Sequence, residues 1–217
     1  MAVGLSTKIR REALLALYPV ARGDVWRVGA VARVGCLDAR EVTLNGFAKR
    51  LLDGRVVSEV RTSLPRGPAD VTRAFRLAGI VGYRVHFPDF LRRAADLLVS
   101  LAAGASARVV MGAPWLATWS ALADARGFAT LGVTVPEEEP NRNGASIVEW
   151  TGRIDGPAMP DGVATCLLDP FCGEGSYLVE AVAAGHDAIG TELVAWRAAA
   201  ALGALGAAAG GVAPELG

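Results

Sequence analysis

Apolar positions along this chain follow two alternating patterns. Short apolar runs rich in valine, isoleucine and leucine alternate with longer stretches whose apolar residues recur every three or four positions. The short runs are typical of buried strands, and the longer stretches are typical of amphipathic helices. Helices are predicted at residues 8–18, 69–77, 88–104, 115–127, 176–185 and 194–205. Strands are predicted at residues 25–39, 53–65, 80–87, 107–114, 128–135, 145–150, 163–169 and 187–193.

This alternation of strands and helices predicts the fold class. Strands separated by single helices form βαβ units, which build a largely parallel sheet covered on both faces. The runs at 128–135 and 145–150 are separated only by a polar loop, which favours an antiparallel pair. A Gly- and Pro-rich connector at 152–162 has no independent core on either side of it. We therefore expect an α/β fold in which residues 1–217 form a single domain.

Composition narrows the class of protein. A hydrophobic content of 52% and a mean hydropathy of +0.35 suit a chain with a substantial core. No apolar run is long enough to span a membrane, and the first residues lack the order of a signal peptide. The three cysteines, Cys36, Cys166 and Cys172, are odd in number and have no metal-ligand spacing. These features predict a cytoplasmic protein with reduced thiols, no metal and no membrane partner.

Charge is unevenly distributed although the net charge is zero. Residues 1–100 carry 17 of the 22 Lys and Arg residues but only 9 of the 22 Asp and Glu residues. Such asymmetry is typical of a protein with one face for a polyanion. It is equally compatible with solvated helix faces that attract one another across the fold.

The stretch LLDPFCGEGS at 167–176 carries the clearest chemical signal. Gly173 and Gly175 lie between a predicted strand and a predicted helix, where glycine permits positive φ and close approach by a ligand. Asp169 ends that strand. Glu192 ends the next strand, where an acid can bind both hydroxyls of a ribose. The pattern predicts a nucleoside-cofactor site at the carboxyl ends of adjacent parallel strands.

The stretch from 169 to 193, DPFCGEGSYLVEAVAAGHDAIGTEL, resembles the S-adenosylmethionine-binding motif of amino-methyltransferases. The usual form is DPFCGSGT, a helix, and a strand of the pattern IG-[VIT]-[DE]. Ser176 stands where threonine is usual, and Glu174 replaces a small residue. The resemblance implies that S-adenosyl-L-methionine is the cofactor and that the motif residues bind it: Asp169, Pro170, Phe171, Cys172, Gly173, Gly175, Ser176 and Glu192. Within that set, Asp169 and the glycine loop would hold the amino-acid part, and Glu192 would hold the ribose.

The late position of this motif resembles the permuted, β-class order of DNA N6-adenine and N4-cytosine methyltransferases. In that order a catalytic and target half, here 1–151, precedes the cofactor half, here 163–206. The resemblance implies a Rossmann-like methyltransferase fold, with a seven-stranded, mostly parallel sheet, one antiparallel hairpin and a permuted strand order. It also implies methyl transfer to an exocyclic amino group in DNA.

The catalytic motif of that family, [DNS]-P-P-[YFW], is only partly present. At the end of the strand predicted at 53–65, Ser63 and Pro65 match the motif and are the predicted catalytic residues, whereas Leu64 and Arg66 depart from it. A second stretch, 112–115, keeps the proline and the aromatic but lacks the polar first residue. A catalytically inactive binding subunit and a methyltransferase for RNA or another substrate therefore remain alternatives.

Recognition of a DNA target has little room in this chain. No free insert is longer than roughly 25 residues, so a separate target-recognition domain is not expected. The basic first half would face phosphate. Specificity would come from a short loop or a partner subunit, or would be absent, and a homodimer is a further possible assembly.

Overall fold

The computed structural model describes residues 7–42, 46–82, 84–135, 146–159 and 164–217, so the predicted loop at 136–145 lies outside the described residues. The strands are β1 (Val25–Val28), β2 (Ala32–Cys36), β3 (Glu59–Ser63), β4 (Ser106–Gly112), β5 (Ala129–Thr134), β6 (Ile147–Arg153), β7 (Cys166–Asp169), β8 (Asp187–Glu192) and β9 (Pro214–Leu216). The α-helices are α1 (Thr7–Leu17), α2 (Phe47–Leu52), α3 (Pro68–Leu77), α4 (Phe87–Ala102), α5 (Leu116–Asp124), α6 (Ser176–Ala183) and α7 (Ala195–Ala208). Two 3-10 turns, Ala39–Glu41 and Ala113–Trp115, complete the described elements.

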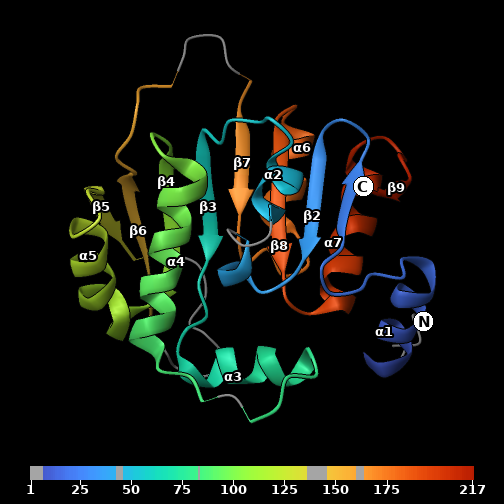
Figure 1. Cartoon of the computed structure of the whole chain (residues 1–217), viewed down its shortest axis with the longest axis horizontal. Coiled ribbons are helices and arrows are strands. Elements are labelled where there is room, and N and C mark those ends of the chain that lie inside the picture. Colours follow the sequence, from blue (N-terminus) through green and yellow to red (C-terminus); the bar gives the residue numbers. More distant parts are fainter. Residues whose placement is uncertain (1–6, 43–45, 83, 136–145, 160–163) are drawn as a thin grey trace.

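All described strands join one sheet in the order β5-β6-β4-β3-β7-β8-β2-β1-β9. The five central strands, β4, β3, β7, β8 and β2, are mutually parallel. At one edge β6 and β5 are antiparallel, and this pair is the predicted hairpin. The α/β class and the permuted strand order are confirmed, because β7 and β8, late in the chain, lie between the early strands β3 and β2 (Figure 1).

The predicted count of seven strands with one hairpin is wrong at the other edge of the sheet. The valine-rich run at 25–39 forms two antiparallel strands, β1 and β2, because Gly29 turns the chain at φ 53°. The apolar residues around this turn hide it in the sequence pattern. The C-terminal β9 then pairs with β1, so the sheet has nine strands and a second antiparallel flank.

A further local difference concerns the segment predicted as a strand at 80–87. Its described residues form no strand, and Phe87 already begins α4. Gly79 and Gly82 adopt positive φ values of 77° and 76°, which an extended strand does not accommodate. The segment is instead the connection between α3 and α4.

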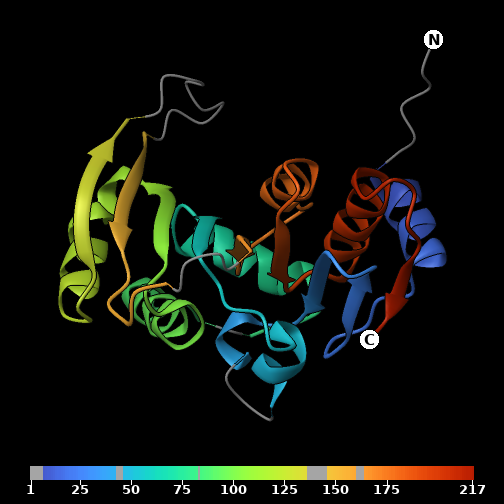
Figure 2. The same cartoon turned by 90° about the horizontal axis from the view of Figure 1, so that it is seen from above.

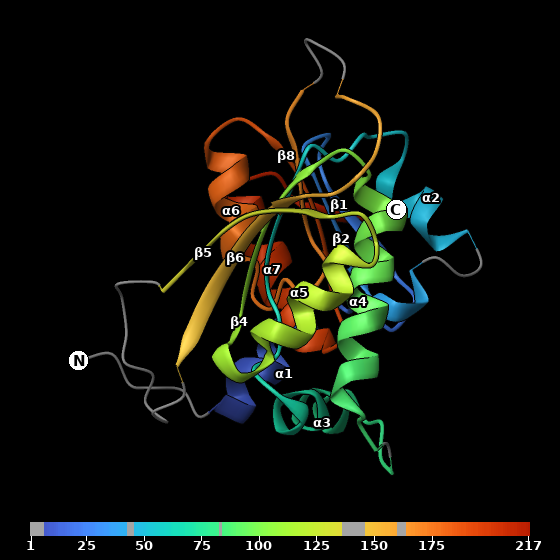
Figure 3. The ribbon, with the colours of Figure 1, turned by 90° about the vertical axis from the view of Figure 1, so that its left-hand side faces the viewer.

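Helices cover both faces of the sheet, as the alternation predicts (Figures 2 and 3). On one face, α4, α5 and α2 bury a large core that includes Leu91, Leu98 and an edge-to-face pair of Trp119 and Trp150. On the other face, α6 and α7 pack through small residues and leucines such as Leu178 and Leu202, and α1 lies against α7. Burial of these apolar side chains is the main stabilising contribution to the fold.

The parallel strands place their carboxyl ends at one edge of the sheet. β3, β7, β8 and β2 all end there, and α3 lies across these ends (Figure 1). Such an edge is where open α/β sheets bind ligands. Among the described helices, none is long and apolar enough to cross a membrane.

Candidate functional site

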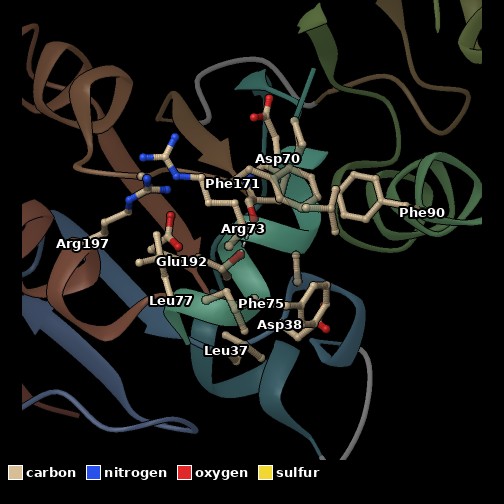
Figure 4. A pocket seen from close by; sticks show the side chains of 18 of the residues that line it. Leu37, Asp38, Asp70, Arg73, Phe75, Leu77, Phe90, Phe171, Glu192 and Arg197 are labelled. Carbon is tan, nitrogen blue, oxygen red and sulfur yellow. Dashed lines mark hydrogen bonds between the residues drawn. The ribbon is translucent and has the colours of Figure 1, made fainter. Parts of the chain in front are cut away.

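A cavity of about 260 Å³ lies at the carboxyl edge of the sheet (Figure 4). Its walls come from the segments that follow β2, β3, β7 and β8 and from the inner side of α3. The cavity is lined both by the predicted catalytic residues and by several of the predicted cofactor-binding residues: Ser63, Pro65, Pro170, Phe171, Gly173 and Glu192. The structure therefore brings two segments about a hundred residues apart in the sequence into one site.

Glu192 lies at the end of β8 with only 7% of its surface exposed. Its Oε1 accepts a hydrogen bond from the backbone N–H of Val194 at 2.7 Å. Burial raises the pKa of this carboxyl group, while the Val194 N–H and the charge of Arg197 act in the opposite direction. A carboxylate held rigidly in this way at a cavity wall is suited to accept hydrogen bonds from a ligand's hydroxyl groups.

Asp169 lies at the end of β7 with 2% of its surface exposed, behind the cavity wall. Its Oδ1 accepts hydrogen bonds from the Thr62 hydroxyl at 2.6 Å and from the Phe171 backbone N–H at 3.1 Å. Burial raises the pKa of this carboxyl group to about 7, although both hydrogen bonds favour its ionised form. Asp169 thus joins the glycine loop to the strand that carries Ser63.

The two glycines of the loop have different environments. Gly173 has φ 56°, and a Cβ at this position would meet no atom within 4 Å. Gly175 has φ 87°, and a Cβ there would lie 2.9 Å from the Cβ of Ala201 on α7. Gly173 therefore leaves space beside the cavity, whereas Gly175 is required by the close packing of α7.

Cys172 and Ser176 lie away from the cavity lining. Cys172 is buried, and its sulfur faces Gly190 of β8, where a Cβ would lie only 2.9 Å from Sγ. Burial raises the pKa of the Cys172 thiol well above its usual range, so the group stays neutral. Ser176 is the exposed first residue of α6.

The two positions of the 62–66 strand end that depart from the motif, Leu64 and Arg66, lie in different environments. Leu64 is 4% exposed and packs in the core, so its side chain points away from the cavity that Ser63 and Pro65 line. The Ser63 hydroxyl lies 3.2 Å from the Tyr177 hydroxyl of α6, and either group can donate. Arg66 is exposed.

The two candidate catalytic stretches lie side by side, because β3 and β4 are neighbours. A Cβ on Gly112 would lie 2.6 Å from the Arg66 carbonyl oxygen, and a Cβ on Gly67 would lie 3.5 Å from the Trp115 Nε1. The Trp115 ring packs on Phe87 with 4.6 Å between centroids. The cavity lining includes Ser63 and Pro65 but no residue of the 112–115 stretch, which favours the 62–66 strand end as the reactive one.

Several cavity residues were not singled out from the sequence. Asp38 follows β2, and Arg73 of α3 and Arg197 of α7 lie beside Glu192 (Figure 4). Thr62, the hydrogen-bond donor to Asp169, is fully buried. Asp38 could have been predicted as a cavity residue, because it lies at the carboxyl end of a predicted strand. No pattern in the sequence places α3 over the cavity.

DNA methyltransferases are among the solved structures whose fold resembles that of this chain. TTHA0409 of Thermus thermophilus, a candidate DNA modification methylase solved with S-adenosyl-L-methionine, superposes with a TM-score of 0.59 at 19% identity, covering 83% of this chain and 96% of its own. M1.HpyAVI in complex with its cofactor gives 0.54 at 12% identity, covering 80% and 98%. The cytosine-N4-specific PvuII DNA methyltransferase gives 0.53 at 11% identity, covering 79% and 86%.

No protein-family model and no curated protein sequence matches this chain. The structural likeness therefore establishes the fold: an α/β methyltransferase-like architecture shared along most of the chain.

The contrast between the loop glycines predicts different costs of substitution. Gly175→Ala should lower the free energy of unfolding by about 2–4 kcal/mol, because its Cβ meets Ala201 in addition to adopting a left-handed conformation. Gly173→Ala, the matched control, should cost only about 1 kcal/mol, because its Cβ enters open space. Urea denaturation followed by circular dichroism measures both values, and equal losses would contradict this division of roles.

Burial of Asp169 predicts a pH-dependent stability. The carboxyl group ionises near pH 4 in an unfolded chain but near 7 in the folded protein, so the folded state holds the extra proton between these values. The free energy of unfolding of the wild type should therefore fall, relative to Asp169→Asn, as the pH rises from about 4 to about 7. Urea titrations across this range measure the difference, and parallel profiles for the two proteins would refute it.

Proposed function

We propose that this protein is a methyltransferase that uses S-adenosyl-L-methionine and acts on an exocyclic amino group in DNA. The observation that carries the proposal is that one cavity at the carboxyl edge is lined both by the motif residues Phe171, Gly173 and Glu192 and by Ser63 and Pro65. The fold, which is that of structures solved with this cofactor, supports the same assignment.

The cavity residues fit a nucleoside cofactor. Glu192 would accept hydrogen bonds from the ribose hydroxyls, and the open space beside Gly173 would take the amino-acid part. Phe171 would contribute an apolar wall, because it packs against Phe90 with 5.4 Å between ring centroids. Pro170 also lines this wall. Asp169, Cys172, Gly175 and Ser176 would act indirectly, by holding the loop and its helix in place.

The chemistry at the strand end is mainly a matter of positioning. When bound, S-adenosyl-L-methionine supplies an electrophilic methyl group on a sulfonium. The Ser63 hydroxyl and the Pro65 carbonyl would accept hydrogen bonds from the two N–H bonds of the target amino group. The nitrogen lone pair would then be directed at the methyl group, and after transfer the nitrogen would lose one proton to solvent.

A second candidate function is a catalytically inactive subunit that binds the cofactor and supports an active partner. The exposed Arg66 favours it, because the motif there normally supplies an aromatic ring for a base extruded from the duplex. A homodimer or a partner subunit could also supply sequence specificity in either case. Under either function we expect a cytoplasmic protein. We also expect residues 1–217 to form one domain, with a catalytic half at 1–151 and a cofactor half at 163–206.

Transfer of a labelled methyl group separates these functions. The protein is incubated with labelled S-adenosyl-L-methionine and unmethylated DNA, and the nucleosides are then analysed by mass spectrometry. N6-methyladenine or N4-methylcytosine supports the enzyme. Cofactor binding without transfer to DNA or RNA supports the inactive subunit, and absence of cofactor binding excludes both.

Cofactor affinity should depend on Glu192. Glu192→Gln should weaken binding of S-adenosyl-L-methionine by about tenfold, roughly 1.4 kcal/mol, because one carboxylate acceptor is lost at the ribose. Isothermal titration calorimetry measures the dissociation constant. Glu180→Gln is the matched control, since Glu180 lies on the outer side of α6 in an ion pair with Arg61. An equal loss in both variants would contradict the assignment.

Turnover should depend on Ser63. Ser63→Ala should lower methyl transfer by roughly 10- to 100-fold, because the target nitrogen loses a positioning contact, and cofactor affinity should change much less. Ser100→Ala, which removes an exposed hydroxyl on α4, serves as the control. Single-turnover assays measure the transfer step. Full activity in both Ser63→Ala and Pro65→Ala would place the reaction at another strand end.

A further inference from the structure

The segment from Arg66 to Arg84 carries a group of positive charges beside the site. Arg66, Arg73, Arg76 and Arg84 are exposed, and no ion pair joins any of them to another described residue. Some arginines elsewhere on the surface are paired, among them Arg27 with Glu215 and Arg92 with Asp96, whereas others, such as Arg108 and Arg153, form no ion pair with a described residue. Guanidinium groups without an acidic partner among the described residues are available to phosphate.

α3 carries two of these arginines, Arg73 and Arg76, and its inner side lines the cavity. Val71 and Phe75 anchor the inner side of the helix in the core, while Arg76 lies on its exposed side. Arg73 lies between the two sides, with its guanidinium beside Arg197 at the cavity wall (Figure 4). A helix of ten residues is about 15 Å long, a length over which one strand of DNA places about four phosphates.

The connection after α3 adds an exposed apolar tip. Val81 is 83% exposed, the highest value among the large apolar side chains described, and it lies between Gly79 and Gly82. Arg76 and Arg84 flank this turn in the chain, which runs back beneath α3 toward α4 (Figure 1). Proteins that bend DNA insert apolar side chains between base steps and use arginine or lysine beside them, and Val81 with its flanking arginines offers both kinds of group.

We propose that duplex DNA lies along α3 and the turn at 78–82, with Arg66, Arg76 and Arg84 on its phosphates and Val81 against a base step. This inference rests on the proposed function and names the surface that presents DNA to the Ser63 strand end. It also gives Arg66 a role, because a phosphate contact replaces the aromatic contact of the motif. Phosphate contacts hold a duplex without reading its sequence, which suits a chain with no large inserted recognition domain.

Fluorescence anisotropy with a short labelled duplex, in the presence of S-adenosyl-L-methionine, tests the surface. The double variant Arg76→Gln/Arg84→Gln should bind at least tenfold more weakly than the wild type. The slope of log affinity against log salt should fall by about two, because two phosphate contacts are lost. The matched control, Arg108→Gln/Arg153→Gln, removes two exposed strand arginines that form no ion pair with a described residue, and it should bind within twofold of the wild type.

Val81→Ser separates the apolar contact from the charges. This variant should bind the duplex about threefold more weakly with an unchanged salt slope, because no phosphate contact is lost. Unchanged affinity would overturn the role of Val81. Cofactor affinity, measured on every variant, should equal that of the wild type and thereby shows that each variant is folded.

The remaining outcomes distinguish this surface from the proposed function. If the arginine double variant binds DNA as well as the wild type does, the surface is overturned, and methyl transfer by the same preparation still supports the enzyme. If the wild type prefers single-stranded RNA of the same length, the duplex is the wrong partner. If the wild type binds no nucleic acid, the surface and the DNA substrate are both overturned.

Discussion

The buried hydrogen bond between the Thr62 hydroxyl and the Asp169 carboxyl group holds the two halves of the site together. It joins β3, which carries the proposed reactive strand end, to β7, which leads into the glycine loop. A buried carboxyl group is costly unless it is hydrogen-bonded, so a relative shift of the two strand ends would cost Asp169 one of its two hydrogen bonds. The relative position of the cofactor loop and Ser63 therefore follows from satisfying one acidic group.

Much of the fold could be predicted because its signals are local. The alternation of apolar runs with amphipathic stretches indicated the central parallel strands, and the resemblance of the late glycine motif to permuted methyltransferases implied that β7 and β8 lie between earlier strands. The second antiparallel flank could not be predicted. Its turn at Gly29 lies inside a valine-rich run without other turn signals, and the short β9 is defined only by pairing with β1. Long-range pairing of that kind leaves no periodic mark.

The candidate site could likewise be predicted only in part: the residues of one motif could be placed, but the features that depend on tertiary packing could not. Glu192, Phe171 and Gly173 could be placed from the spacing of one motif, and they line the cavity as that spacing suggests. The close approach of α7 to Gly175 depends on tertiary packing, so the sequence could not separate its role from that of Gly173. The position of α3 over the cavity likewise depends on tertiary packing. Val71 and Phe75 hold the helix there through contacts with the core, and these contacts exist only in the assembled fold.

The strand order has a consequence for how the sheet assembles. β3 lacks one of its neighbours and β2 lacks another until β7 and β8 are present, so residues before these strands can form only two separate sheet fragments. Each fragment exposes an unpaired edge of a strand that ends up central, and unpaired edges favour association between chains. β7 and β8 join the two fragments into one sheet and bring the glycine loop to Ser63. Pairing of β7 and β8 with β3 and β2 therefore joins the sheet and forms the binding site in the same step of folding.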